Sequence, residues 1–160
     1  KRDMNYPELP RFGIRLFLPK EMDQITYCGI GPMESYCDKR IAGSYGVYHD
    51  TVAEMHEDYI RPQENGSHCG CDYVVVADDT MMLTAVSTKL FSFNASIYTQ
   101  EEMTKKNHNY ELVPCGSTVF CLDYAQAGIG SQSCGPKLME QYRLDDEAFT
   151  FEMKLMPEMR

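Results

Sequence analysis

The stretch "STVFCLDY", residues 117–124, alternates its side chains between the two faces of an extended chain. One face carries Val119, Cys121 and Asp123, and the other carries Thr118, Phe120, Leu122 and Tyr124. A period of two, built from β-branched and aromatic residues, predicts a β-strand.

The same period of two recurs elsewhere in the chain. "FTFEMKL", residues 149–155, places its apolar side chains on one face, which predicts a half-buried antiparallel strand. "RFGIRLFL", residues 11–18, alternates in the same way, and "DYVVVA" (72–77) and "KLFSFNAS" (89–96) are rich in strand-forming residues. Together these runs predict an all-β domain of about ten antiparallel strands with long polar loops.

One helix is predicted, in "YTQEEMTKKNHNYEL", residues 98–112. Thr99 followed by Glu102 has the pattern of a capping box, with acidic residues in the first turn. Lysines and His108 stand in the last turn, where the helix dipole favours cations. We expect a helix of about ten residues, 99–108, on the surface because its residues are polar.

Composition restricts the classes of partner. The chain has 160 residues, with 15 Lys and Arg against 24 Asp and Glu, and a net charge of −9. Because a phosphate backbone is bound by clustered basic residues, we expect no nucleic-acid partner. No apolar stretch approaches the roughly 18 residues of a membrane-spanning helix, and no signal peptide is visible, so we expect no membrane partner. The length fits one domain, and the start at Lys1 suggests a piece of a longer chain.

The seven cysteines form no disulfide framework. The nearest metal-like group is the "HCGC" run of residues 68–71, which lacks a matching second pair of ligands. Cys28 and Cys37 stand too far apart for a local thiolate pair. We therefore interpret the cysteines as reduced thiols of a cytoplasmic protein, with no metal site in this chain.

The run "YCGIGPMESYCDKR", residues 27–40, invites comparison with a phosphate-binding loop because it contains Gly29 and Gly31. A dinucleotide fingerprint needs a third glycine followed by a helix. Here Glu34 stands at the third position, where its carboxylate would repel a phosphate, and Pro32 removes a backbone donor. We therefore expect a loop with another purpose.

Four stretches of the chain combine into a longer pattern. G-x-G-P-x-E-x-Y-x-D-[KR] is matched by Gly29, Gly31, Pro32, Glu34, Tyr36, Asp38, Lys39 and Arg40. P-x-E-N-G is matched by Pro62, Glu64, Asn65 and Gly66. F-x-F-[NS], Y-[ST]-x-x-x-[LM] and H-x-x-E-L are matched by Phe91, Phe93, Asn94, Tyr98, Thr99, Met103, His108, Glu111 and Leu112. G-[IV]-G is matched by Gly128, Ile129 and Gly130, and in this order the motifs resemble the C-terminal β domain of the β-galactosidases of glycoside hydrolase family 2.

The resemblance implies a specific architecture. In that family this domain is a large antiparallel β-sandwich, a supersandwich similar to galactose mutarotase, that follows a (β/α)₈ catalytic barrel in the same polypeptide. Residues 1–160 would be the later part of the sandwich, truncated at its N-terminal side, with one short surface helix. The two catalytic glutamates and the magnesium ligands of the family belong to the barrel. The resemblance therefore implies no catalytic residue, metal or cofactor in this chain.

Glu34 and Glu64 invite a second interpretation, because a retaining glycosidase uses two carboxyl groups about 5 to 5.5 Å apart. An anchoring role is favoured. Glu64-Asn65-Gly66 has the pattern of a turn, with Asn65 or Gly66 at positive φ and Glu64 bonded to backbone or to an arginine.

Residues 27–40 are predicted to be a transition from a β-strand to a loop, held by Gly-Pro turns and by a polar network. Glu34, Tyr36, Asp38 and Arg40 are expected to fix the loop by polar contacts. Asp38 and Arg40 are also expected to form a salt bridge, which is strong only if it is partly buried.

One loop of the family reaches the active site. It follows the G-[IV]-G turn, often has the sequence G-G-D-D-S-W-G-P, and offers a tryptophan to the sugar. This chain has "SQSCGP", residues 131–136, with Cys134 at the tryptophan position. The resemblance implies that Ser133, Cys134 and Gly135 lie near the substrate. Cys134 would either leave space for a different aglycone or simply pack.

The leading hypothesis is a non-catalytic domain of a β-galactosidase that scaffolds the barrel and borders its pocket for a terminal β-D-galactoside. Its partners would be the barrel and the galactoside, in a homo-oligomeric parent. An independent carbohydrate-binding module is the alternative, and a free-standing mutarotase-like enzyme is disfavoured because the histidines pair with no glutamate. A sandwich separated from its barrel should expose an apolar or aromatic patch, with Tyr27, Tyr36 and Tyr45 as candidates.

Overall fold

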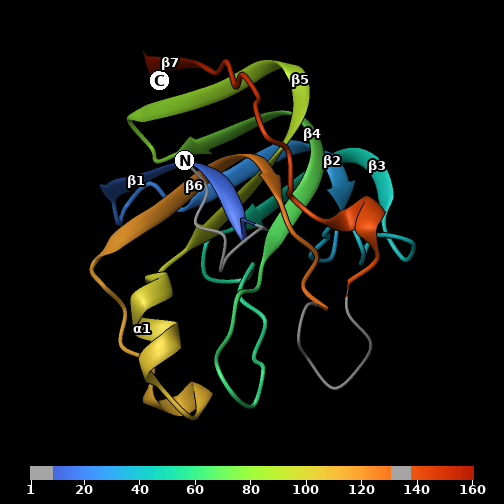
Figure 1. Ribbon diagram of the computed structural model, residues 1–160. Coiled ribbons are helices and arrows are strands. Elements are labelled where there is room, and N and C mark those ends of the chain that lie inside the picture. Colours follow the sequence, from blue (N-terminus) through green and yellow to red (C-terminus); the bar gives the residue numbers. More distant parts are fainter. Residues whose placement is uncertain (1–8, 131–137) are drawn as a thin grey trace.

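The computed structural model describes residues 9–130 and 138–160 of the chain (Figure 1). The strands are β1 (Arg11–Pro19), β2 (Gln24–Gly31), β3 (Ser44–Thr51), β4 (Ser67–Ala77), β5 (Met81–Ser96), β6 (Ser117–Gln126) and β7 (Lys154–Met159). The helical elements are α1 (Gln100–Lys105) and the 3₁₀ turns η1 (Asn109–Glu111) and η2 (Glu140–Tyr142). No helix among the described residues has the length and apolar character needed to cross a membrane.

The strands form one antiparallel sheet in the order β1-β6-β5-β4-β2-β3, with β7 paired to β5 outside this path. This confirms the predicted all-β, antiparallel fold class. The described residues contain seven strands, fewer than the predicted number. Strands form at four of the alternating or strand-rich runs, in β1, β4, β5 and β6.

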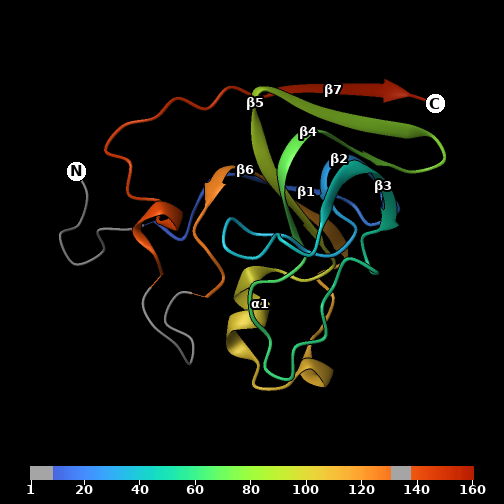
Figure 2. The same ribbon diagram turned by 90° about the vertical axis from the view of Figure 1, so that its right-hand side faces the viewer.

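Strand β5 changes partners along its length. This change lets one part of the sheet lie over another, as the layers of a β-sandwich do. Its first part, Met81 to Val86, pairs with β7, and its last part, Ser92 to Ser96, pairs with β6. Strand β4 accompanies both parts, with register shifts between His68 and Tyr73. The β5–β7 ribbon therefore lies across the rest of the sheet (Figure 2). Both parts of β5 contribute to one hydrophobic core.

Large side chains from the central strands fill this core. Phe93, Phe120 and Leu122 are fully buried, together with Tyr27 and Val74. Strand β6 lies between β1 and β5, and from Thr118 to Asp123 the residues on both of its faces are buried rather than one row alone. Asp123 is therefore a charged group in a buried strand, and it needs a partner.

The predicted surface patch is wrong for two of its three tyrosines. Tyr27 and Tyr36 are 1% and 2% exposed, because both rings fill the interior of the fold, whereas Tyr45 on β3 is exposed. Three further exposed apolar side chains lie on β1, at the opposite edge of the sheet: Phe12, Ile14 and Phe17.

The last strand differs from its prediction. The alternation in residues 149–155 predicts a strand, but ladder pairing with β5 begins only at Lys154. Phe149 instead packs its ring against Tyr124 at 4.8 Å and against Phe12 at 4.4 Å, measured between ring centroids. The apolar residues of this segment pack against the sheet without hydrogen bonding to it as a strand, which the pattern of side chains alone does not distinguish.

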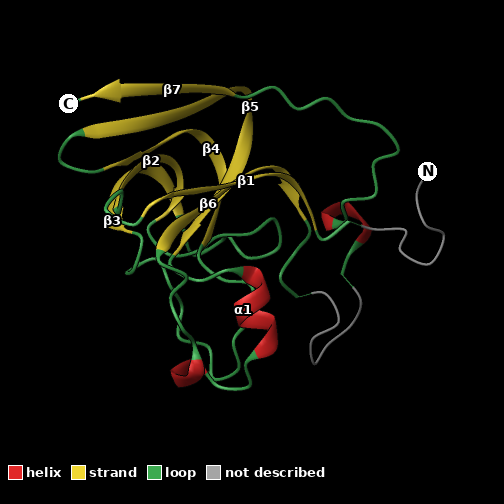
Figure 3. Ribbon diagram, turned by 90° about the vertical axis from the view of Figure 1, so that its left-hand side faces the viewer, coloured by secondary structure: helices red, strands yellow, loops and turns green. Residues whose placement is uncertain are grey.

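Helix α1 begins as predicted and ends early. The Thr99 hydroxyl accepts a hydrogen bond from the Glu102 amide at 3.1 Å, and only Met103 is buried. The helix ends at Lys105 because the Glu111 carboxylate draws the amides of residues 107 and 108 into a separate turn. Helix α1 and the loop of residues 52–66 lie together beyond the ends of the strands (Figures 2 and 3).

Candidate functional site

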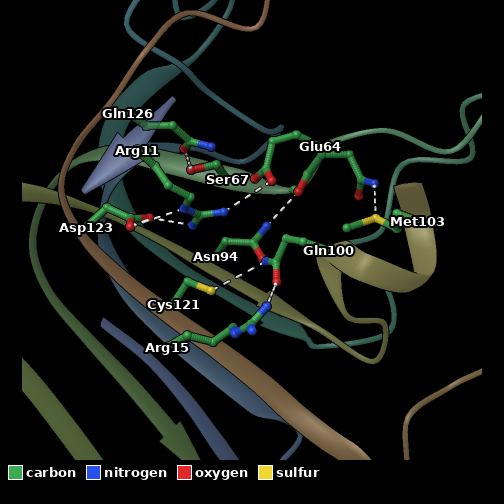
Figure 4. Close-up of polar contacts among 12 residues, drawn as sticks. Arg11, Arg15, Glu64, Ser67, Asn94, Gln100, Met103, Cys121, Asp123 and Gln126 are labelled. Atoms are coloured by element: carbon green, nitrogen blue, oxygen red, sulfur yellow. Dashed lines mark hydrogen bonds and ion pairs between the residues drawn. The ribbon is translucent and has the colours of Figure 1, made fainter. Parts of the chain in front are cut away.

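Arg11, at the start of β1, joins two carboxylates from distant parts of the chain (Figure 4). Its guanidinium donates to both oxygens of Asp123 on β6, at 3.2 Å and 2.5 Å. It also donates to Glu64 in the loop before β4 at 3.1 Å. Three segments that are remote in sequence are therefore fixed together by one side chain.

Burial controls the electrostatics of this cluster. Burial raises the pKa of Asp123, whose side chain is 3% exposed, while the hydrogen bond from Arg11 opposes the increase. Burial also raises the pKa of Glu64, and the charge of Arg11 again opposes it. Burial lowers the pKa of Arg11, but its contacts with Asp123 and Glu64 raise it overall. Breaking such a buried pair leaves an uncompensated charge, which is costly.

The turn expected at Glu64-Asn65-Gly66 is present. Gly66 has φ of +68°, and Glu64 bonds to an arginine, as the anchoring interpretation requires. The Asn65 side chain accepts a hydrogen bond from the Glu57 amide at 3.1 Å and donates to the Gln63 carbonyl at 2.9 Å. These contacts fix the loop in which Glu64 lies.

Glu34 lies in the loop that follows β2, since residues 27–31 belong to that strand as the predicted strand-to-loop transition requires. Its buried carboxylate accepts hydrogen bonds from the Lys39 ammonium at 2.5 Å, from the Tyr59 hydroxyl, and from the Gly66 amide at 2.7 Å. The Tyr36 hydroxyl accepts a hydrogen bond from the Ser67 amide at 3.4 Å. Glu34 and Tyr36 therefore tie this loop to the turn that carries Glu64.

Asp38 and Arg40 do not meet as predicted. The Asp38 carboxylate accepts hydrogen bonds from the amides of Ile129 and Gly130, each at 3.0 Å. The Arg40 side chain is exposed, and the ion pairs of the described residues include none between it and Asp38. Asp38 is therefore bonded to two consecutive backbone amides, a partner that the sequence pattern does not predict.

Two hollows flank the Arg11 cluster. One, of about 320 Å³, is lined by residues of β1 and β6 together with Gln100. The other, also about 320 Å³, is lined by residues 61–64 and by Gln100, Met103 and Thr104 of α1. Gln100 lines both, and its amide donates to the Cys121 thiol at 3.5 Å. Arg15 donates to Gln100 and Glu101, so polar groups border both hollows (Figure 4).

The "HCGC" run lies in the hydrophobic interior. His68, Cys69 and Cys71 are buried, and Nδ1 of His68 donates to the Ile30 carbonyl at 3.3 Å. Within residues 9–130 and 138–160, no three His, Cys, Asp or Glu side chains gather as metal ligands would.

Sequence reasoning missed Arg11, Asp123, Lys39 and Tyr59. Two signals were available: Asp123 is a charge inside an otherwise apolar strand pattern, and Lys39 is part of the pattern that begins at Gly29. Ser133, Cys134 and Gly135, the residues expected near the substrate, lie outside the described residues.

Each of the three carboxylates contacts a cation of the same chain, and one guanidinium serves two of them. Glu34 is paired with a lysine, while Glu64 and Asp123 share Arg11. A nucleophile or a general acid has to reach a substrate, whereas each of these carboxylates is bonded to a cation of its own chain, although the buried Oε1 atom of Glu64 has no hydrogen-bond partner within the described residues. The geometry therefore fits anchoring.

Comparisons with known proteins agree on one family. The sequence model of the β-galactosidase small-chain family matches residues 1–155 of this chain. The β-galactosidase of Actinobacillus pleuropneumoniae is 46% identical over 155 residues, which cover 97% of this chain and 15% of the relative. That of Staphylococcus xylosus is 43% identical over 155 residues, covering 97% and 16%, and that of Kluyveromyces lactis is 32% identical over 150 residues, covering 93% and 14%. The chain thus spans only about 15% of the length of these relatives, and it belongs to the β-galactosidase small-chain family.

Proposed function

We propose that this chain is a non-catalytic domain of a β-galactosidase, in which it scaffolds a catalytic barrel and borders the pocket for a terminal β-D-galactoside. The observation that carries the proposal is the match, over nearly the whole chain, to a small part of much longer β-galactosidases. A domain that accounts for 15% of such an enzyme leaves ample chain for a separate catalytic barrel.

The chemistry of the buried carboxylates supports a structural role. A retaining mechanism needs one carboxyl group as acid and base and a second as nucleophile, both facing the sugar. Glu34 and Glu64 instead hold backbone and cations of their own chain. The catalytic pair, the magnesium ion and the subunit contacts of a cytoplasmic, homo-oligomeric parent would then belong to the rest of the polypeptide.

A chimera tests the scaffolding role. The matched segment of the Actinobacillus enzyme is replaced by this chain, and hydrolysis of a nitrophenyl β-galactoside is measured. Because the two segments are 46% identical, the chimera should fold and retain activity. The same enzyme with the segment deleted should lose activity. An active deletion variant, or a folded but inactive chimera, would contradict the proposal.

A second variant tests the border with the sugar pocket. Cys134→Trp in the chimera places an aromatic face at the position where the family has tryptophan. The change in KM for galactosides should correspond to a free energy of roughly 1–3 kcal/mol, the size of one pocket contact, and the variant should still fold. Unchanged kinetics for every galactoside tested would remove this part of the proposal.

The carbohydrate-binding module finds less support. A flat sugar is bound by aromatic side chains gathered on one face. Here Phe12 and Phe17 are exposed on β1, Tyr45 on β3 at the opposite edge of the sheet, and Tyr110 on η1, so these rings share no face.

A further inference from the structure

Strand β1 is a long edge of the sheet with one side open. Within residues 9–130 and 138–160 it pairs with β6 alone, so the backbone groups along its other side meet no partner strand there. Its nine residues present a continuous row of such amides and carbonyls. An open edge of this kind readily accepts another strand, because the unpaired backbone groups then find partners.

The side chains of β1 favour such pairing. Native proteins usually protect an open edge with charged side chains that face solvent. Here Phe12, Ile14 and Phe17 are the exposed apolar residues of the strand. Arg15, in the middle of the strand, is drawn toward α1, where its guanidinium donates to the Glu101 carboxylate at 2.9 Å and 3.0 Å. The edge therefore combines unpaired backbone with apolar side chains.

The opposite edge, β3, is of a different kind. Its side chains bond to the neighbouring strands of their own sheet: His49 with the Thr26 hydroxyl at 2.9 Å, and the Tyr45 hydroxyl with the Asp72 carboxylate. Polar residues that face solvent in this way are typical of an edge that stays unpaired. Strand β3 is therefore a natural control for β1.

A hollow of about 320 Å³ lies beside β1 (Figure 4). It is lined by residues 11–15 of the strand and by Gln100, Cys121 and Asp123. Its charged groups already have partners, since Arg11 pairs with Asp123 and Arg15 pairs with Glu101. A charged side chain entering the hollow would find no free counter-charge, whereas a neutral one would contact its apolar wall. When a strand adds to an edge, its alternate side chains enter such pockets.

We propose that the free edge of β1 pairs with a strand of the parent polypeptide outside residues 1–160, and that a neutral, apolar side chain of that strand enters the hollow. The proposal rests on the part of the proposed function that makes this chain a domain of a longer polypeptide. The matched segment is 15% of the Actinobacillus enzyme, so such a polypeptide has ample chain for this strand. A second copy of the chain is a poorer occupant, because each copy carries a net charge of −9 and like charges repel.

Cysteine labelling in the chimera tests whether β1 is covered. Ile14→Cys and Val47→Cys place thiols on β1 and β3, at positions that are 41% and 53% exposed in the described residues. Modification by a maleimide is followed by mass spectrometry of peptides, which separates these thiols from the native ones. An uncovered β1 would let both thiols react at similar rates. With the added strand in place, the thiol at position 14 should react more slowly, on the order of tenfold.

Photo-cross-linking identifies what covers the strand. Phe17, which is 56% exposed on β1, is replaced in the chimera by benzoylphenylalanine, and Tyr45 on β3 is replaced in the same way as the control. After irradiation, position 17 should cross-link to a peptide of the same polypeptide outside residues 1–160. Cross-links that join two copies of the chimera overturn the proposal, and so does a yield no higher than that of position 45.

Amide exchange needs no substitution, so it decides the matter even where a variant fails to fold. Residues 11–19 should exchange more slowly in the chimera than in the 160-residue chain, while residues 44–51 exchange alike in both. Equal exchange of residues 11–19 in the two proteins overturns the proposal.

Hydrolysis of a nitrophenyl β-galactoside by the same chimera separates this proposal from the proposed function. An active chimera whose thiols at positions 14 and 47 react equally keeps the proposed function and overturns the role of β1. A folded but inactive chimera with a protected position 14 supports the strand contact and removes the scaffolding role in catalysis.

Discussion

His68 should make the stability of this chain depend on pH. Its ring lies 4.4 Å from that of Tyr27 and stacks on Phe93 at 5.4 Å, between ring centroids. Nδ1 carries the proton, because the Ile30 carbonyl opposite can only accept. Burial lowers the pKa of His68 from 6.5 to about 4, although the Ile30 carbonyl and the charge of Glu34 favour the protonated ring.

The sign and size of the effect follow from this difference. The unfolded chain binds a proton at His68 below about pH 6.5, whereas the folded chain resists it until about pH 4. The free energy of unfolding is therefore retained above pH 6.5 and falls as the pH drops through this interval. Because each unit of pKa corresponds to about 1.36 kcal/mol, the full loss is about 3 kcal/mol, of which about 2 kcal/mol has occurred by pH 5.

Urea unfolding at pH 8 and pH 5 measures this loss, with His68→Asn as the perturbation. Asparagine does not titrate, and its amide can still donate to the Ile30 carbonyl. Glu64 and Asp123, whose pKa values are raised by burial, act with the opposite sign in both proteins, so the comparison cancels them. The wild type should lose about 2 kcal/mol more than the variant between the two pH values. An equal loss of unfolding free energy in the wild type and in His68→Asn would refute the reasoning. The control variant is His108→Asn, at an exposed position.

Two further predictions concern stability. Thr99→Ala removes the cap of α1 and should lower the free energy of unfolding by about 1 kcal/mol in urea titrations, whereas Thr104→Ala, at an exposed position of the same helix, should cost less. Asp123→Ala leaves Arg11 without its main partner and should cost about 3–5 kcal/mol, and replacing all three charged groups by Arg11→Met, Glu64→Gln and Asp123→Leu should recover much of this. A cost below about 1 kcal/mol for Asp123→Ala would show that the cluster does not stabilise the fold.

The fold class was open to prediction because period-two patterns report which side chains are buried together. Strands β1, β4, β5 and β6 arise where the patterns place them. The change of partners in β5 was not predictable, since residues 87–90 contain no glycine or proline to mark it. Residues 149–153 show the converse error, because aromatic side chains pack at a period of two without strand pairing.

In the candidate site, too, some features could be predicted from the sequence and others could not. The turn at Gly66 follows from local chemistry, since a glycine after asparagine readily takes positive φ. The partners of Asp38 and Asp123 lie 91 and 112 positions away in the sequence, so they depend on the register of the whole sheet. Local spacing paired Asp38 with Arg40, but the fold supplied the backbone of Ile129 and Gly130 instead.

The central claim, that this chain contributes structure to a β-galactosidase and not its chemistry, is tested most directly by a hydrolysis assay of the purified 160-residue chain. With a nitrophenyl β-galactoside as substrate, the chain should show no turnover above the buffer blank, while the chimera assayed beside it releases nitrophenol. Hydrolysis by the chain alone that Glu34→Gln or Glu64→Gln abolishes would contradict the claim, because those carboxylates would then be catalytic groups rather than anchors.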